Sequence, residues 1–388
     1  MAETPPRGFP AEEFAARTAR AQAGMAEQGL AGLLLTTEPE VRYFSGFQTL
    51  FWQSPTRPWF LFVPDVGKPI AMIPEIGDAL MATTWIDDIR TWPAPEPDDD
   101  GIGLLTDLLA PLARGRAQIG VLKGPETHLR MPLADYERLM VALPGLAVAD
   151  ATPLIRSLRM AKSQAEITKL QHICAIGSAT FAQVPHFAHP GLPQAEAFRA
   201  FRREALAQGA DDVPYLVGGA GPGGYGDIIS PPTDRPLAQG DVLMFDTGCV
   251  WDGYYCDFDR NFAIGYADDT ARRAYDVLWR ATEAGLQAAR PGAACRALYD
   301  AMRAVTAEMD QGGGDVGRLG HGLGMQLTEW PSHAQWDDTV IEEGMVLTLE
   351  PSLSYGDGLM MVHEEDIVIE AGGPRLLTRR APPELPVI

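Results

Sequence analysis

The chain has 388 residues, of which 46% are hydrophobic and 21% are charged, so it is long enough to form two domains with separate cores. Its 52 acidic and 31 basic side chains give a net charge of −21. A surface this negative repels nucleic-acid phosphates and anionic lipids, which excludes roles on nucleic acids and on membrane surfaces. The same charge suits cationic small molecules.

The cysteines and the N-terminus predict a cytoplasmic location. The four cysteines form no CxxC pattern, which is typical of free thiols in a reducing compartment. The N-terminus lacks the basic start and apolar run of a signal peptide, and no apolar stretch approaches the ~20 residues that cross a bilayer. We therefore expect a protein without nucleic-acid or membrane partners.

The first 155 residues predict an α/β domain. Apolar residues at helical spacing over 11–28 end at Gly29, and an apolar run over 30–35 predicts a buried strand. Strand patterns follow at 59–63, 70–73 and 118–122, and helical patterns follow at 102–114 and 133–142. Because strands and helices alternate, we predict one α/β domain over residues 1–155.

Residues 156–388 predict an α+β domain. Ser163-Gln164-Ala165-Glu166 has the form of a capping box, which opens a long helical region with a break at Pro190-Gly191. Two strand blocks, at 241–265 and 345–370, are separated by a helical stretch at 267–312. Runs of helices beside runs of strands predict an antiparallel sheet.

The first strand block predicts a hairpin with buried acidic residues. Asp252-Gly253 is a strong turn signal, and folding the chain there brings Asp246 and Asp257 to nearly opposed positions. Asp259 lies two residues beyond Asp257 and so points to the same face. Apolar neighbours indicate that this face is buried, where like charges repel strongly. A cation between the carboxylates would remove that repulsion.

The second strand block repeats this arrangement. Glu350 and Glu364 flank a turn centred on Gly356-Asp357-Gly358, and His321 lies between the two hairpins in Gly320-His321-Gly322-Leu323-Gly324. The glycines there permit a close approach of the backbone to a ligand. One imidazole and four carboxylates form an oxygen-rich set that suits two divalent metal ions, for which we favour Mn over Fe, Co and Zn.

The order of these residues resembles that in the pita-bread metallopeptidases, a family that includes prolidase, aminopeptidase P, methionine aminopeptidase and the metal-free creatinase. The shared motifs are Asp-x-Gly with Gly-Tyr-x-x-Asp-x-x-Arg, then His-Gly-x-Gly and Leu-Glu-Pro, over residues 155–370. The sequence before them, including Val41–Phe47, is similar to the N-terminal domain of the two-domain members. The resemblance implies a pita-bread fold with a curved antiparallel sheet in the domain at 156–388.

The resemblance also implies roles for the metal ligands. Asp257 and Glu364 would bridge the two ions. Asp246 would complete the shell of one ion, whereas His321 and Glu350 would complete that of the other. The implied reaction is attack by a metal-bridging hydroxide on an amide or peptide bond, as in Xaa-Pro dipeptidase or aminopeptidase P. A homodimer that acts on a small molecule or a short peptide is implied as well.

The sequence departs from the family pattern at three positions. Thr328 stands seven residues after His321, where family aminopeptidases have a second histidine, and Ser230 stands near the place of another. Asp259 replaces a threonine. These departures keep a non-peptidase alternative open, either an elimination like that of dimethylsulfoniopropionate lyase or a creatinase-like C–N hydrolysis of a small cationic substrate. The intact ligand set disfavours a third alternative, a non-catalytic binding protein.

Other groups near the motifs are candidates for the missing proton transfer, which is worth about 10²–10⁴-fold in rate. The candidate catalytic residues are His333, Glu329, Asp259 and Arg260. We expect His333 on the rim of the active site. His363 alternates with Glu364 along a strand, and we expect it to face away from the metal ions.

Overall fold

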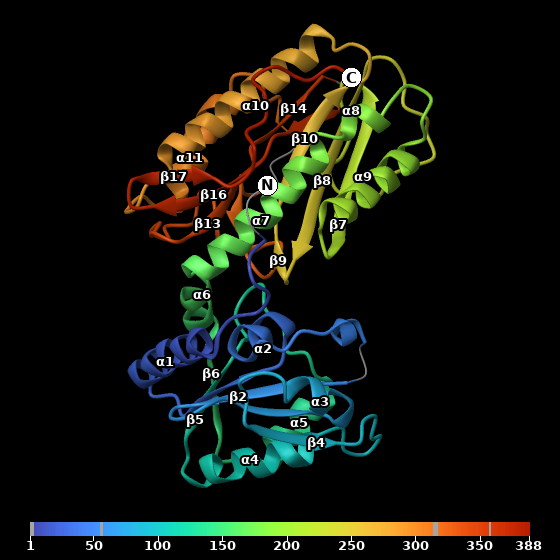
Figure 1. The fold of residues 1–388 in the computed structure, drawn as a ribbon. Coiled ribbons are helices and arrows are strands. Elements are labelled where there is room, and N and C mark those ends of the chain that lie inside the picture. Colours follow the sequence, from blue (N-terminus) through green and yellow to red (C-terminus); the bar gives the residue numbers. More distant parts are fainter. Residues whose placement is uncertain (1–3, 55–56, 313–316, 357) are drawn as a thin grey trace. The chain divides into compact units, whose positions relative to one another are not determined.

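The computed structural model describes residues 4–54, 57–312, 317–356 and 358–388. The chain divides into two compact units, Pro6–Arg159 and Met160–Ile388, and each unit has its own apolar core (Figure 1). The first unit is an α/β unit with a mixed sheet, and the second combines antiparallel sheets with long helices. This confirms the predicted fold class.

The N-terminal unit is built on a six-stranded sheet with the order β4-β3-β2-β1-β5-β6. Strands β1, β2 and β3 pair antiparallel, and the remaining pairs are parallel. The strands are β1 (Gly32–Leu35), β2 (Phe60–Pro64), β3 (Ile70–Pro74), β4 (Asp88–Trp92), β5 (Gln118–Val121) and β6 (Ala147–Asp150). The helices are α1 (Ala11–Gln28), α2 (Glu38–Ser45), α3 (Asp78–Met81), α4 (Ile102–Arg114), α5 (Leu133–Ala142) and α6 (Thr152–Met160), with 3₁₀ turns η1 (Leu50–Gln53) and η2 (Glu75–Gly77).

Most of the larger elements of this unit agree with the sequence prediction, whereas the edge strands and several helices were not predicted. The three predicted helices are confirmed as α1, α4 and α5, and Gly29 ends α1 with a φ of 65°. The four predicted strands correspond to β1, β2, β3 and β5. The prediction missed α2, α3, α6, β4 and β6. Strands β4 and β6 form the two edges of the sheet and are half-exposed, so they lack the apolar run of a buried strand.

The first long helix of the C-terminal unit begins where the sequence predicts, and the predicted helical stretch at 267–312 is two helices, Asp269–Ala288 and Cys295–Thr306. The capping box is confirmed, because Ser163 Oγ accepts a hydrogen bond from the Glu166 backbone N–H at 3.3 Å and the Glu166 carboxylate accepts one from the Ser163 N–H at 2.9 Å. The helices are α7 (Gln164–Phe181), α8 (Val184–Phe187), α9 (Gln194–Gln208), α10 (Asp269–Ala288) and α11 (Cys295–Thr306).

Antiparallel strands form the rest of this unit. One sheet has the order β10-β8-β7 with β9 paired to β8, a second has the order β12-β11-β13-β16-β17, and β14 pairs with β15. The strands are β7 (Asp212–Pro222), β8 (Asp241–Trp251), β9 (Tyr254–Tyr255), β10 (Phe258–Ala263), β11 (His321–Gly322), β12 (Glu329–Ser332), β13 (Val346–Leu349), β14 (Ser352–Tyr355), β15 (Leu359–Val362), β16 (Glu365–Glu370) and β17 (Gly373–Leu376).

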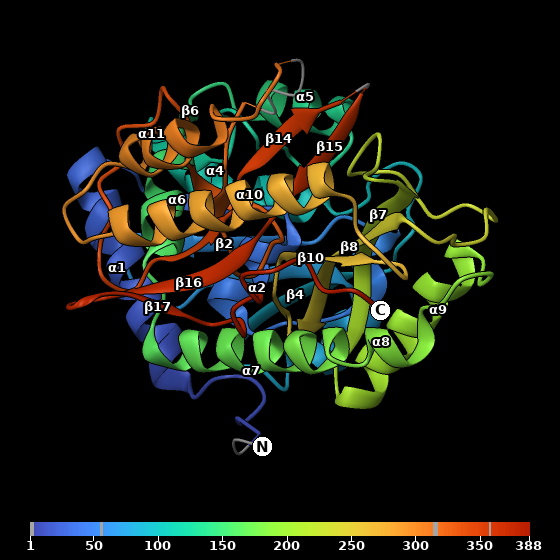
Figure 2. The ribbon, with the colours of Figure 1, turned by 90° about the horizontal axis from the view of Figure 1, so that it is seen from above.

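Strands β10 and β16 bring the two larger sheets together. They contact each other, α7 packs on β8 and β9, and α10 packs on β13, β14 and β15. Figure 2 shows β10 and β16 between α7 and α10. The two hairpins that carry the predicted acidic residues therefore meet inside this unit.

Both predicted hairpins are present. Asp252 and Gly253 form a two-residue turn between β8 and β9, and both have positive φ angles, of 45° and 72°. The second hairpin keeps one register through the pairs Leu349↔Glu365 and Ser352↔Val362, so Glu350 and Glu364 face each other where the ladder is interrupted. Asp357, the centre of the predicted turn, lies outside the described residues.

Candidate metal centre

Five side chains gather where the two hairpins meet. Asp257, His321 and Glu364 are buried, and each offers one ligand atom within 4.8 Å of the other two. His321 Nε2 lies 3.5 Å from Asp257 Oδ2 and 3.9 Å from Glu350 Oε2. Burial raises the pKa of Asp257, Glu350 and Glu364, and Asp246 is close enough that its negative charge raises them further.

The first hairpin places its carboxylates differently from the prediction. Asp246 pairs directly with Asp259, not with Asp257. The next pair, Phe258↔Thr247, puts Asp257 one position before β10 and diagonal to Asp246. The two-residue turn fixes this register. Because Asp257 and Asp259 are two residues apart in an extended chain, all three carboxylates still lie on one face.

The imidazole of His321 is prepared for a metal ion. Its Nδ1 lies 2.9 Å from the Gly322 carbonyl oxygen, which accepts a hydrogen bond when Nδ1 carries the proton. Burial lowers the pKa of His321 to about 3, so the ring is neutral and Nε2 carries a lone pair. Nε2 and Asp257 Oδ2, 3.5 Å apart, are then both acceptors. A cation between them would satisfy both atoms.

Several buried carboxylate oxygens at this centre are also unsatisfied among the described residues. Within the described residues, Asp246 Oδ1, Asp259 Oδ2 and Glu364 Oε1 are buried and have no hydrogen-bond partner. Burial raises the pKa of Asp246 to about 7, and burial and the charge of Asp246 raise that of Glu350 to about 8. Unpaired buried anions of this kind are stable only when they are protonated or bound to a cation. The donor set therefore fits hard divalent metal ions.

Two residues that the sequence analysis did not single out act on this centre. Tyr215 Oη donates a hydrogen bond to Asp246 Oδ2 at 3.2 Å. Burial raises the pKa of Asp257 and Glu350, and the positive charge of Arg318 offsets part of that rise. Tyr215 was missed because the glycines at the end of β7 made that segment unlike a strand in the sequence. Arg318 could have been predicted near the centre, because it lies three residues before His321.

Glu329 holds the loop that follows His321. Its Oε1 accepts hydrogen bonds from the backbone N–H groups of Met325 at 2.9 Å and Gln326 at 3.2 Å, and its Oε2 lies 3.1 Å from Lys162 Nζ. The Lys162 and Glu329 side chains are both buried. Both carboxylate oxygens thus hold the loop that follows His321, which indicates a positioning role, and proton transfer by Glu329 stays a prediction.

His333 is fully buried rather than on a rim. Its backbone N–H donates to the Gly320 carbonyl at 2.8 Å, and neither ring nitrogen has a hydrogen-bond partner among the described residues. Burial lowers its pKa to about 4, so the ring is neutral. Gly320 has a φ of 131°, and a Cβ there would lie 2.6 Å from the ring of His333 and overlap the Thr348 carbonyl. The glycine thus makes room for the chain itself, which corrects the expected approach to a ligand.

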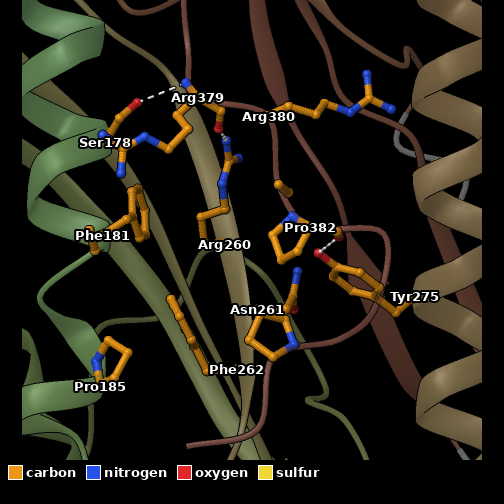
Figure 3. A pocket seen from close by; sticks show the side chains of 13 residues that line it. Ser178, Phe181, Pro185, Arg260, Asn261, Phe262, Tyr275, Arg379, Arg380 and Pro382 are labelled. Carbon is orange, nitrogen blue, oxygen red and sulfur yellow. Dashed lines mark hydrogen bonds between the residues drawn. The ribbon is translucent and has the colours of Figure 1, made fainter.

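Arg260 lies on the opposite face of β10 from Asp259. Its guanidinium donates to the Glu365 carboxylate at 2.9 Å and to the backbone carbonyls of Glu364 and Arg379, each at 2.7 Å. A surface pocket of about 180 Å³ lies there, and Figure 3 shows Arg260 pointing toward Arg379 along it. These contacts indicate a positioning role, because Arg260 holds the backbone of Glu364 from the far side of the strand, and a catalytic role for Arg260 stays a prediction.

The remaining expected positions differ in burial and orientation. Thr328 is exposed and Ser230 is half-buried. His363 Nδ1 lies 2.9 Å from Thr282 Oγ1, and its ring packs edge-on against Tyr275. Both partners belong to α10, so His363 faces away from the carboxylates, as its position in the sequence predicts.

Comparisons with known proteins extend over both units. The family model for Metallopeptidase family M24 matches residues 168–371, and that for the Creatinase/Prolidase N-terminal domain matches residues 17–161. The chain is 32% identical to the Probable dipeptidase PepE of Mycobacterium tuberculosis (strain ATCC 25618 / H37Rv) over 98% of each protein. It is 29% identical to the Xaa-Pro dipeptidase of Pyrococcus furiosus over 58% of this chain and 65% of that protein.

The fold is shared with solved structures as well. The crystal structure of dipeptidase PepE from Mycobacterium ulcerans aligns with a TM-score of 0.83 and 29% identity, covering 98% of this chain and 99% of that one. In the part of the chain that the structure describes, no helix combines the length and the apolar character needed to cross a membrane.

Proposed function

Because the chain belongs to metallopeptidase family M24 and is a hydrolase of that family, we propose that it is a dinuclear metal-dependent dipeptidase that cleaves the peptide bond before proline. The observation that carries this proposal is the convergence of Asp257, His321 and Glu364, with ligand atoms within 4.8 Å of one another. Relatives named dipeptidase and Xaa-Pro dipeptidase support the choice of substrate.

Each ligand has a proposed place in the metal pair. Asp257 and Glu364 would bridge two divalent ions, Asp246 would bind one of them, and His321 with Glu350 would bind the other. We favour Mn because carboxylate ligands predominate in the set. Two such ions supply the Lewis acidity that activates water and polarises the scissile carbonyl.

Neighbouring residues would keep these ligands in place. The hydrogen bond from Tyr215 to Asp246 leaves Asp246 Oδ1 as the oxygen without a partner. The Lys162–Glu329 ion pair closes the loop after His321, and Leu327 of that loop packs on Gly248, where a Cβ would overlap it. These contacts support a rigid site whose ligands need little rearrangement to bind metal ions.

Glu350 is our candidate for proton exchange with the substrate. Its side chain is 23% exposed, whereas that of Asp257 is 6% exposed. A carboxylate with this access can pass a proton between the scissile bond and solvent. Thr328 is exposed and cannot transfer a proton as a histidine at that position would. We propose that Glu350 carries out this proton transfer instead.

One observation favours a second candidate function. Asp259 adds a buried carboxylate to the centre. Thr328 stands where family aminopeptidases have a histidine, so this position supplies no imidazole. An additional negative charge suits a small cationic substrate, so a lyase-like elimination or a creatinase-like C–N hydrolysis on the same metal pair is the alternative.

A substrate panel distinguishes the two functions. We expect the Mn²⁺-loaded protein to hydrolyse Xaa-Pro dipeptides faster than dipeptides without proline, and to leave creatine-like amides and dimethylsulfoniopropionate unchanged. Turnover of a cationic non-peptide without dipeptide hydrolysis would replace the dipeptidase proposal with the alternative.

Variants of the bridging ligands test the metal dependence. Asp257→Ala and Glu364→Ala should each lose bound metal and all activity in elemental analysis and peptide assays. Asp252→Ala is a control, because Asp252 is also a buried carboxylate but pairs with Lys169 at the hairpin turn. Two equivalents of metal in either bridging variant would contradict the assigned roles.

We also propose a cytoplasmic homodimer. The four cysteines are free and buried, as is common for proteins of reducing compartments. The dimer follows from the family resemblance, and light scattering should give twice the chain mass of 42.0 kDa. A mass of one chain across micromolar concentrations would contradict it.

A further inference from the structure

We propose that Asp259 is a sixth protein ligand of the metal pair and binds the same divalent ion as Asp246. The inference rests on the proposed metal centre and adds a ligand to the five that the family resemblance implies. A further carboxylate increases the number of oxygen ligands, which favours Mn²⁺ over Zn²⁺, since Zn²⁺ prefers four ligands that include nitrogen or sulfur.

The β8–β10 ladder fixes Asp259 opposite Asp246. The pairs on either side, Phe258↔Thr247 and Arg260↔Phe245, continue the same register. Side chains that face each other directly in an antiparallel pair have Cβ atoms about 4.5–5.5 Å apart. Two carboxylates at this separation can reach one ion between them.

Each of the two facing carboxylates has one satisfied oxygen and one unsatisfied oxygen. Asp259 is 1% exposed, its Oδ1 accepts a hydrogen bond from Asn261 Nδ2 at 3.1 Å, and its Oδ2 has no partner among the described residues. Asp246 shows the same division, because Oδ2 accepts from Tyr215 and Oδ1 has no described partner. Two buried oxygens on facing residues are thus left for one cation.

The donor that holds Asp259 is itself held. Asn261 Nδ2 also donates to the Val362 carbonyl at 2.7 Å, and Asn261 Oδ1 accepts from Tyr225 Oη at 2.9 Å. Tyr225 Oη in turn accepts from the Val362 N–H at 2.9 Å. The Asn261 amide therefore has a fixed orientation, and it orients the Asp259 carboxylate as outer-shell partners orient metal ligands.

An ion pair with the adjacent arginine does not account for Asp259. The Arg260 guanidinium extends from the other face of β10 and donates to the carboxylate of Glu365. Among the described residues, its hydrogen bond to Asp259 is to the backbone carbonyl, at 2.6 Å, and not to the carboxylate. Because the nearest arginine is occupied elsewhere, the charge of Asp259 is left to the metal centre.

Metal titration of the stripped protein tests the assignment without relying on activity. Isothermal titration calorimetry should show two Mn²⁺ ions per wild-type chain. In Asp259→Asn and Asp259→Thr, the Mn²⁺ affinity of one site should fall by at least about tenfold while the other site is unchanged, and the Zn²⁺ affinity should fall less. Asp241→Asn is the matched control, because Asp241 is a buried carboxylate on β8 that pairs with Arg235.

The outcomes separate this proposal from the proposed function. Two Mn²⁺ sites of wild-type affinity in folded Asp259→Asn and Asp259→Thr would overturn the ligand role, even if the KM for a cationic substrate rose. A wild-type chain that binds no Mn²⁺ would overturn both proposals. Electron paramagnetic resonance of bound Mn²⁺ should also change in the Asp259 variants and not in Asp241→Asn.

Discussion

The acidic centre should make the metal-free protein less stable as the pH rises. Unfolded Asp and Glu side chains titrate near pH 4, whereas burial raises the folded-state pKa of Asp246 to about 7 and that of Glu350 to about 8. Between these values the folded chain binds more protons than the unfolded chain, so the free energy of unfolding falls with increasing pH. The stabilisation is complete below about pH 4 and is lost as the pH passes through the folded-state pKa values.

The size of the effect follows from the pKa of one residue. Each unit of pKa difference corresponds to about 1.4 kcal/mol. For Asp246, the rise from 3.8 to about 7 predicts a loss of about 4 kcal/mol between roughly pH 4 and pH 7. The contribution of Glu350 does not simply add, because a proton shared between neighbouring carboxylates relieves the repulsion of both.

Urea unfolding of the stripped protein between roughly pH 5 and pH 8 measures this slope. Asp246→Asn should flatten it, whereas Asp241→Asn should retain it, because Asp241 is paired with Arg235 at 2.7 and 2.8 Å. Excess Mn²⁺ should reverse the slope, since metal binding requires deprotonated ligands. A metal-free stability that rises with pH, or an Asp246→Asn slope equal to that of wild type, would refute the reasoning.

Three further substitutions test the supporting contacts. Lys162→Met leaves the buried Glu329 carboxylate without its ammonium partner and should lower the free energy of unfolding, measured in urea, by about 3–5 kcal/mol. Adding Glu329→Gln should recover part of this loss. A change below about 1 kcal/mol would contradict the buried ion pair. Tyr215→Phe removes the hydrogen bond to Asp246 and should weaken Mn²⁺ binding about 10–100-fold in calorimetry, so an unchanged affinity would count against a positioning role. Ser163→Ala removes the α7 cap and should cost about 1 kcal/mol in thermal unfolding, with metal content unaffected.

Local sequence patterns were sufficient to predict the elements whose structure depends on one short segment. The apolar spacing of α1 and the cap of α7 depend on neighbouring residues, and both predictions hold. The second hairpin was predicted correctly because Glu350 and Glu364 lie symmetrically about its turn. In the first hairpin, the two-residue turn at Asp252-Gly253 fixes Asp246 opposite Asp259, a consequence that counting outward from the turn would have given.

Partners that are distant in the sequence limited the rest of the prediction. Glu329 is held by Lys162, 167 residues away, and Arg260 by Glu365, 105 residues away. A carboxylate or guanidinium near a motif has the same sequence signal whether it faces the reaction or supports it from behind. Only the tertiary contacts distinguish these roles.

Anomalous diffraction from crystals soaked in Mn²⁺ tests the central claim most directly. We predict two peaks between the hairpins, both in contact with the carboxylates of Asp257 and Glu364 and one also with His321 Nε2. An absence of peaks at these side chains at saturating Mn²⁺, or ordered Mn²⁺ bound only elsewhere on the chain, would contradict the account.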